Sequence, residues 1–210
     1  MKTTRKSAPP LPWLKPAVFV GSLTPVAALL IRGLHGELGA NPISQALNQL
    51  GLIALVFLVA ALACTPLKMI FGWTWPIRLR RMLGLYAFFY ATLHVSTYTG
   101  LDQVFDWQAI FADVTKRKFF FVGFAAFVLL IPLAVTSTSA AVKRLGYAHW
   151  KRLHRLAYVA PMLGVIHFTW RVKKDVSEPL TYAVILGAFL LVRVVAYLRS
   201  RLSANATACP

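Results

Sequence analysis

The chain has 210 residues, of which 58% are hydrophobic and only 14% are charged. A soluble domain carries roughly 25% charged residues, and long apolar runs recur along this whole sequence, so the composition excludes a soluble globular protein. The net charge of +17 would suit a nucleic-acid-binding protein. We reject nucleic acid as a partner because the basic residues stand in short clusters between the apolar runs.

Six segments are each about long enough to cross a hydrocarbon core of ~30 Å as a helix. They predict an all-α polytopic membrane bundle with about six transmembrane helices, at residues 14–32, 48–70, 82–100, 119–136, 154–171 and 179–198. The first segment follows KTTRK and could be a signal peptide. Its length and the absence of a clear small-x-small cleavage site favour an uncleaved first helix. Cys64 and Cys209 form no metal-binding or redox spacing, so we assign them no role.

The distribution of charge predicts the orientation of the helices. Most lysines and arginines fall on the side that holds the N-terminus, and all six acidic residues fall on the other side. The positive-inside rule therefore predicts that both termini are cytoplasmic. We expect a cytoplasmic segment at 1–13, a membrane domain at 14–198 and a cytoplasmic tail at 199–210. Arg193, about one turn inside the last span, is expected to snorkel toward the cytoplasmic surface.

Two histidines are predicted to reach the same depth on helices that run in the same direction. His94 lies twelve residues into the third span, ~18 Å from the cytoplasmic face, and His167 lies thirteen residues into the fifth, ~20 Å from it. His154 is expected to lie alone at the inner edge. On one ideal helix His154 and His167 would be ~140° apart, so both could face the bundle interior only if Pro161 kinks the helix between them.

An imidazole in lipid is costly unless it has a partner. Two imidazoles at one level could hold a haem iron, which accepts a neutral nitrogen on each side. Zinc would require further ligands, and the absence of carboxylates from the spans argues against a proton-coupled transporter. The alternative is that these histidines are hydrogen-bonded packing residues, and their spacing alone leaves both interpretations open.

Three arginines, Arg78, Arg80 and Arg81, stand at the cytoplasmic start of the third span. They satisfy the positive-inside rule, which is reason enough for their presence. Arginine also binds phosphate groups bidentately, so the alternative is a site for an anionic cofactor or lipid headgroup.

The stretches RLRRMLGLYAFFYATLHVSTY (78–98) and VTSTSAAVKRLGYAHWKRLHRLAYVAPMLGVIHF (135–168) resemble the MsrQ (YedZ) family. The loop GELGANP (36–42) and the segment LACTPL (62–67) are also similar, and the resemblance extends over residues 11–198. This family belongs to the ferric-reductase-like, NADPH-oxidase-like transmembrane superfamily. The 14–198 domain is therefore expected to have that fold.

The resemblance implies an electron-transfer subunit of the bacterial inner membrane, surrounded by lipid, with one or two b-type haems and no catalytic residues of its own. The implied donor is the quinone pool or a cytosolic flavin reductase. The implied acceptor and heterodimer partner is a periplasmic molybdopterin reductase that repairs oxidised methionines. The implied site residues are His94, His154 and His167 for haem, and Arg80 and Arg81, with Arg78 beside them, for the phosphate of FMN.

The sequence departs from the wider superfamily, whose two ligand helices each carry a histidine pair thirteen or fourteen residues apart. Here the fifth span keeps the pair His154 and His167, whereas the third span has Arg80 and Arg81 where a partner of His94 would stand. One outer haem between His94 and His167 is therefore expected. An inner haem would have only His154 and an unknown second ligand, and the arginines suggest FMN at that level.

Two other functions remain open at this stage. A stand-alone ferric or quinone reductase would share the haem but would turn over its substrate without a periplasmic partner. A membrane transport protein would use the histidines for packing or proton relay and would contain no haem. The chain has no GxGxxG sequence, so we do not expect it to oxidise NADPH unaided.

Overall fold

The computed structural model describes residues 12–172 and 175–206. Most of the predicted N-terminal segment 1–13 lies outside the described residues, as do residues 207–210 of the predicted tail, including Cys209. Within the described ranges the chain forms nine α-helices and one π-helical segment: α1 (Leu14–Leu34), α2 (Pro42–Phe71), α3 (Trp75–Thr97), η1 (Tyr98–Asp102), α4 (Trp107–Lys116), α5 (Lys118–Val135), α6 (Ser139–Leu145), α7 (Tyr147–Leu153), α8 (Leu156–Arg171) and α9 (Ser177–Ala206).

Each of the six predicted spans corresponds to one long helix, although the ends differ, which confirms the all-α polytopic class. In the part of the chain that the structure describes, four helices are long and apolar enough to cross a membrane: α1, α2, α5 and the Ser177–Ser203 part of α9. The 16 residues of α8 span ~24 Å, which is shorter than a ~30 Å hydrocarbon core. The first turns of α3 contain the three arginines. The chain is a multi-pass membrane protein, and the count of six spans stays a prediction.

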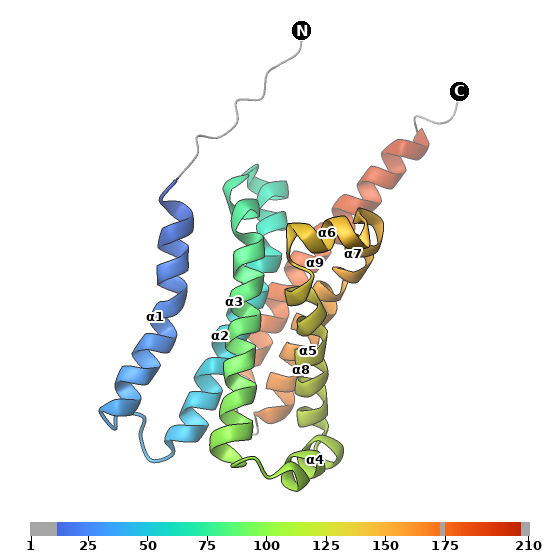
Figure 1. The fold of residues 1–210 in the computed structure, drawn as a ribbon. Coiled ribbons are helices and arrows are strands. Elements are labelled where there is room, and N and C mark those ends of the chain that lie inside the picture. The colour runs from blue at the N-terminus through green and yellow to red at the C-terminus, as the bar shows by residue number, and fades with distance from the viewer. Residues whose placement is uncertain (1–11, 173–174, 207–210) are drawn as a thin grey trace.

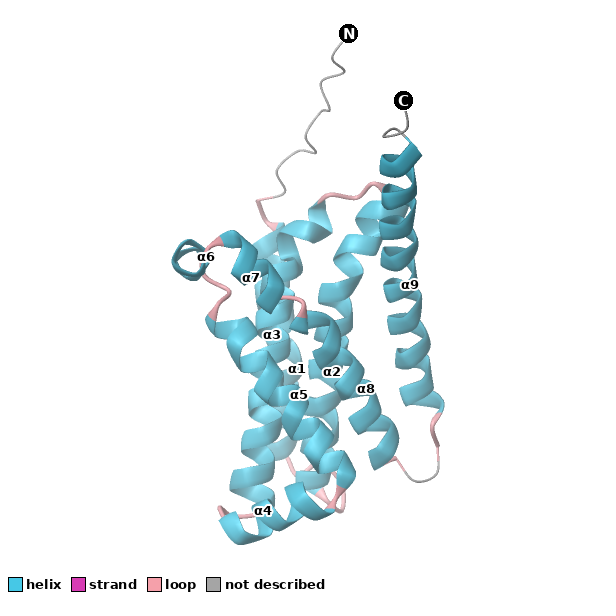
Figure 2. Ribbon diagram, turned by 90° about the vertical axis from the view of Figure 1, so that its right-hand side faces the viewer, coloured by secondary structure: helices cyan, strands magenta, loops and turns pink. Residues whose placement is uncertain are grey.

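The long helices lie side by side along one axis (Figure 1). Two pairs of helices pack most closely, α2 with α3 and α5 with α8, and only the short helices α6 and α7 lie between α5 and α8 in the chain. Helix α9 packs on both α2 and α8. Helices α6 and α7 lie at one end of the bundle and α4 at the other, as Figures 1 and 2 both show. We call these the α6/α7 end and the α4 end. Helix α1 begins and α9 ends at the α6/α7 end (Figure 1).

The described residues form three small apolar clusters inside the bundle, while much of the apolar surface faces outward. One cluster joins α1, α2 and α3 around Tyr90, a second joins α2, α8 and α9 around Leu62, and a third joins α5 and α8 around Ala160. Large apolar side chains such as Phe121 and Leu191 are more than half exposed. Such a surface would be a liability in water, but it suits helices surrounded by lipid.

Proline inside a helix leaves one carbonyl without its usual N–H donor, and the structure supplies a side-chain donor in two cases. In α1, Pro25 leaves the carbonyl of Gly21 free, and the Thr24 hydroxyl donates to it at 2.8 Å. In α2, Pro66 leaves the carbonyl of Leu62 free, and the Arg193 guanidinium of α9 donates to it at 2.7 Å.

The position of Arg193 corrects the expectation that it snorkels to the surface. Its side chain turns into the bundle, where it also donates to the Tyr158 hydroxyl at 2.6 Å and lies over the Tyr158 ring. The reason is the free carbonyl at Leu62, which offers the guanidinium a buried acceptor within reach. Arg193 therefore joins α9 to α2 and α8.

Three short helices were not among the predicted elements, and each changes the course of the chain. Asp106 caps α4 by accepting from the backbone N–H groups of Gln108 and Ala109, and Thr138 caps α6 by accepting from Ala141 N–H. Both are typical N-cap residues, so a search for caps could have found these two helices. Helix α7 ends at Leu153, and His154 lies in the turn before α8.

Candidate functional site

His94 and His167 come together near the α4 end of the bundle. His94 lies in the last turn of α3, and His167 lies four residues before the end of α8. The centres of their rings are 6.3 Å apart, with an angle of 82° between the ring planes. The prediction that these two histidines reach the same level is confirmed.

Each ring is held by a backbone carbonyl of the neighbouring helix. Nδ1 of His94 is 2.9 Å from the carbonyl oxygen of Leu47 in α2, and Nδ1 of His167 is 2.7 Å from that of Phe119 in α5. A carbonyl oxygen can only accept, so in a neutral ring Nδ1 must carry the proton. Nε2 of each imidazole then carries the free lone pair, which is the arrangement of a histidine prepared to bind a metal.

The separation of the two rings fits the haem iron that the sequence predicts. A bond from a metal to an imidazole nitrogen is about 2 Å long and the ring centre lies about 1 Å behind that nitrogen, so imidazoles on opposite sides of one metal have centres about 6 Å apart. The observed separation of 6.3 Å agrees with this value. Among the described residues no three His, Cys, Asp or Glu side chains gather as a metal site would require. The pair therefore offers two imidazole ligands, which is the number that a haem iron would take from the protein.

His154 lies in a different environment. Its Nε2 is 3.1 Å from the Thr136 hydroxyl oxygen, whose own proton goes to the carbonyl of Pro132 at 2.6 Å, so Nε2 must be the donor. The Trp150 ring stacks on the imidazole with 4.1 Å between ring centres, and the Trp150 indole N–H donates to the Thr136 carbonyl. In this arrangement Nε2 is already engaged, unlike the Nε2 atoms of the other two histidines.

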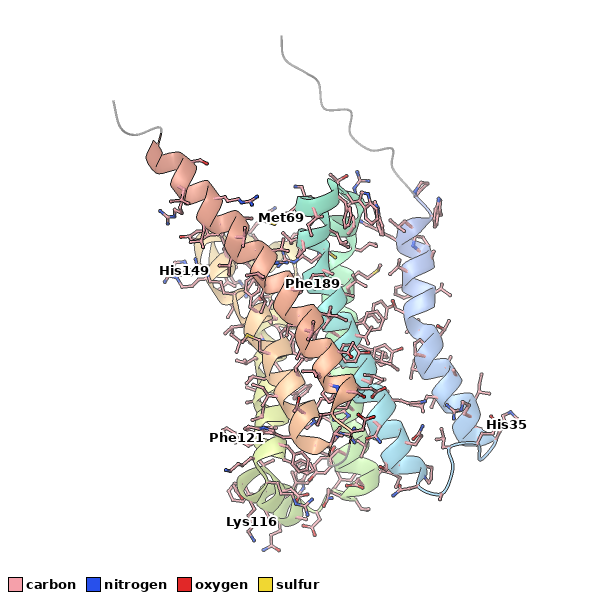
Figure 3. All side chains as sticks on the ribbon, turned by 180° about the vertical axis from the view of Figure 1, so that it is seen from behind. His35, Met69, Lys116, Phe121, His149 and Phe189 are labelled. Atoms are coloured by element: carbon pink, nitrogen blue, oxygen red, sulfur yellow. The ribbon has the colours of Figure 1, made fainter. Side chains whose placement is uncertain are left out.

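The structure does not bring His154 to the paired histidines. Helix α8 begins at Leu156, so eleven residues, or ~17 Å of helix, separate its start from His167. The predicted fifth span began at His154, but the turn before α8 leaves His154 outside that helix. A kink at Pro161 is therefore not needed to account for the positions of the two histidines. His154 therefore lies at the α6/α7 end without His94 or His167. The other two histidines, His35 and His149, are labelled in Figure 3, where they point outward toward opposite ends of the bundle.

The three arginines of α3 differ in exposure. Arg78 and Arg81 are exposed, whereas Arg80 is partly buried. Arg80 is close enough to Cys64, His154 and Arg193 to act on each electrostatically. The six acidic residues lie in three places: after α1, between α3 and α5, and around the start of α9. All three places are at the α4 end of the bundle (Figure 1). Within the described ranges, the α6/α7 end thus gathers positive side chains with no acidic side chain to balance them.

Sequence reasoning missed the residues that hold the paired rings. Leu47 and Phe119 act through their backbone carbonyls, and a carbonyl leaves no trace in residue type. The one signal in the sequence is a polar residue beside Leu47, at the start of an apolar span. That residue, Asn48, accepts a hydrogen bond from Arg171 of α8 and so joins α2 to the end of the helix that carries His167.

The fold and the site together define a multi-pass helical membrane protein with two imidazoles facing one level of its interior. Residues 27–165 match the family model described as the ferric reductase like transmembrane component. The chain is 53% identical over 190 residues to the protein-methionine-sulfoxide reductase heme-binding subunit MsrQ of Rhodospirillum rubrum. The alignment covers 90% of this chain and 91% of that protein.

Two further relatives with the same name are similar over comparable lengths. The protein from Deinococcus radiodurans is 49% identical, with 89% of this chain and 92% of the relative covered. The protein from Herminiimonas arsenicoxydans is 46% identical, with 99% and 96% covered. The chain belongs to the MsrQ family, within the ferric-reductase-like transmembrane proteins.

Proposed function

We propose that this chain is the haem-binding, electron-transferring subunit of a protein-methionine-sulfoxide reductase system, and that His94 and His167 are the two axial ligands of one b-type haem. The observation that carries the proposal is the ring pair itself. The rings are 6.3 Å apart, and each Nδ1 hydrogen bond to a carbonyl leaves Nε2 available. The names of the relatives, which describe a heme-binding subunit, agree with this assignment.

Haem bound here would supply a one-electron redox centre, and the protein would supply ligation, burial and orientation. The carbonyls of Leu47 and Phe119 hold the tautomer, and the helix pairs α2–α3 and α5–α8 hold the separation. Because the pair lies near the α4 end, electrons that reach it would leave on that side. We assign that side to the periplasm on the positive-inside rule, with a periplasmic molybdopterin reductase as acceptor and the chain in the bacterial inner membrane.

The α6/α7 end is proposed to receive electrons from the quinone pool or a cytosolic flavin reductase. Arg80 lies near Cys64, His154 and Arg193, and among the described residues no acidic side chain lies at that end. The unbalanced positive charge favours an anionic cofactor there. FMN is the candidate, with Arg80 as its principal phosphate contact and Arg78 and Arg81 at the exposed rim. A second haem at His154 is the less favoured choice, since Nε2 of His154 already donates to Thr136.

The experiment is a dithionite-reduced minus oxidised absorption spectrum of the detergent-purified protein, compared with His94→Ala, His167→Ala and the exposed-histidine control His35→Ala. The parent and the control should show the same b-type signal, and both ligand variants should lose it. Retention of half the signal would indicate a second haem elsewhere in the protein. Full signal in both ligand variants would refute the axial assignment. A parent without colour, made in haem-replete cells, would favour a transport protein, and turnover of added iron or quinone without a partner would favour a stand-alone reductase.

A further inference from the structure

Each of the paired histidine rings lies against a glycine of the neighbouring helix. A Cβ atom added to Gly123 of α5 would lie 2.5 Å from Nδ1 and 2.7 Å from Cε1 of His167. A Cβ atom added to Gly51 of α2 would lie 3.2 Å from both Nδ1 and Cε1 of His94. At each glycine the three nearest atoms all belong to the histidine ring. The close approach at these two positions is therefore between helix backbone and imidazole.

The glycine and the carbonyl acceptor have the same spacing in both helices. Leu47 precedes Gly51 by four residues, and Phe119 precedes Gly123 by four. Residues four apart lie one above the other on the same helix face. Each helix thus presents a backbone carbonyl and, one turn later, a glycine without a side chain. The imidazole bonds to the carbonyl and lies against the glycine. We call this pair of positions a carbonyl–glycine notch.

We propose that the notches Leu47/Gly51 and Phe119/Gly123 are positioning elements that seat the two axial imidazoles, fix their Nδ1 protons and hold their planes nearly perpendicular. This proposal rests on the proposed function, because it assigns a role to the rings as haem ligands. The hydrogen bond from Nδ1 sets the tautomer, and the glycine lets the ring come close enough to form it. The two notches are unequal, since a Cβ has no room at Gly123 but needs only a small shift at Gly51.

The competing explanation is that the glycines only allow the helices to pack closely, as small residues do in membranes. Two glycines on the helices that carry the histidines provide the comparison. Gly84 lies on α3 with His94 and has open space where its Cβ would be. Gly164 lies on α8 with His167 and would meet only ordinary contact, with Leu55 Cδ1 at 3.4 Å. Alanine at either should leave both rings in place.

The test compares the purified holoprotein with Gly123→Ala, Gly51→Ala, Gly84→Ala and Gly164→Ala, measuring haem per protein and the EPR spectrum of the ferric form. The parent should give the strongly anisotropic low-spin signal that perpendicular imidazole planes produce. Gly123→Ala should displace the His167 ring from its carbonyl partner. Haem affinity should then fall by roughly 10–100-fold, as it does when a metal ligand loses the group that holds it in place. Gly51→Ala should keep its haem but show a shifted largest g value. The two controls should match the parent.

The outcomes separate the two proposals. A parent with bis-histidine haem whose four glycine variants all match it would overturn the notches and leave the proposed function standing. Equal losses in the Gly123 variant and in both controls would also overturn them, because general packing would then be the cause. A parent without haem would overturn the proposed function itself. If Gly123→Ala does not accumulate, Gly51→Ala decides, and an unchanged EPR signal in that variant would count against the notches.

Discussion

The link between Pro66, Leu62 and Arg193 leads to a quantitative prediction. Arg193→Met keeps an unbranched side chain of similar length but removes two hydrogen bonds, to the Leu62 carbonyl at 2.7 Å and to the Tyr158 hydroxyl at 2.6 Å. Hydrogen bonds from a charged donor contribute about 1.5–3 kcal/mol each, but methionine also removes the penalty of a desolvated charge. We therefore expect the free energy of unfolding to fall by about 1–3 kcal/mol.

The second perturbation tests the cause. Pro66→Ala restores a backbone N–H that can donate to the Leu62 carbonyl within α2. In that background Arg193→Met no longer leaves this carbonyl without a donor, so it should destabilise by about 1–2 kcal/mol less than in the parent. Tyr158→Phe is the control, because it removes the other hydrogen bond of Arg193 and leaves Leu62 unchanged. Its effect should add to that of Pro66→Ala.

The assay is unfolding of the detergent-solubilised protein by increasing mole fraction of SDS, followed by circular dichroism, for the parent, each single variant and the double variants. A coupling between positions 66 and 193 below about 0.5 kcal/mol is indistinguishable from additivity. That result would mean that the carbonyl opened by proline is not what holds Arg193 in the bundle.

Three other predictions concern single contacts. Tyr90→Phe removes the hydrogen bond to the Ser22 carbonyl that ties α3 to α1 at 2.7 Å, and in the same SDS titration it should cost about 1 kcal/mol; an unchanged midpoint would contradict it. His154→Gln should keep the b-type absorption, since His154 already donates to Thr136, and loss of all haem from a folded variant would refute the single-haem assignment. Arg80→Gln should retain less FMN than the parent and less than Arg81→Gln, because only Arg80 is partly buried; equal flavin content in all three would leave topology as the role of both arginines.

The long helices could be read from the sequence because lipid imposes a local rule. Without water to bind them, the backbone N–H and C=O groups of a span must pair within the segment. An apolar run of sufficient length is therefore a helix whatever its neighbours are. The short helices at the bundle ends obey no such rule, since water can satisfy their backbone groups. They depend instead on caps such as Asp106 and Thr138.

The direction of a polar side chain was harder to predict than its depth. Arg193 was expected at the surface, because one turn of helix is within the reach of a long side chain. The carbonyl that holds it belongs to a helix more than a hundred residues earlier in the chain, and it is available only because Pro66 follows it by four residues. Nothing near Arg193 in the sequence signals that acceptor.

The depth of the paired histidines follows from the sequence, whereas the orientation of their rings follows from the packing of the helices. The shared depth of His94 and His167 could be predicted from the sequence, because hydrogen bonding within each helix fixes the rise at ~1.5 Å per residue and depth can then be counted. The packing of the helices brings the two rings to 6.3 Å with their planes nearly perpendicular, and it places Gly51 and Gly123 against them. Those contacts depend on which helix faces are turned together when α2 packs on α3 and α5 on α8, and this is settled by the packing of the whole bundle.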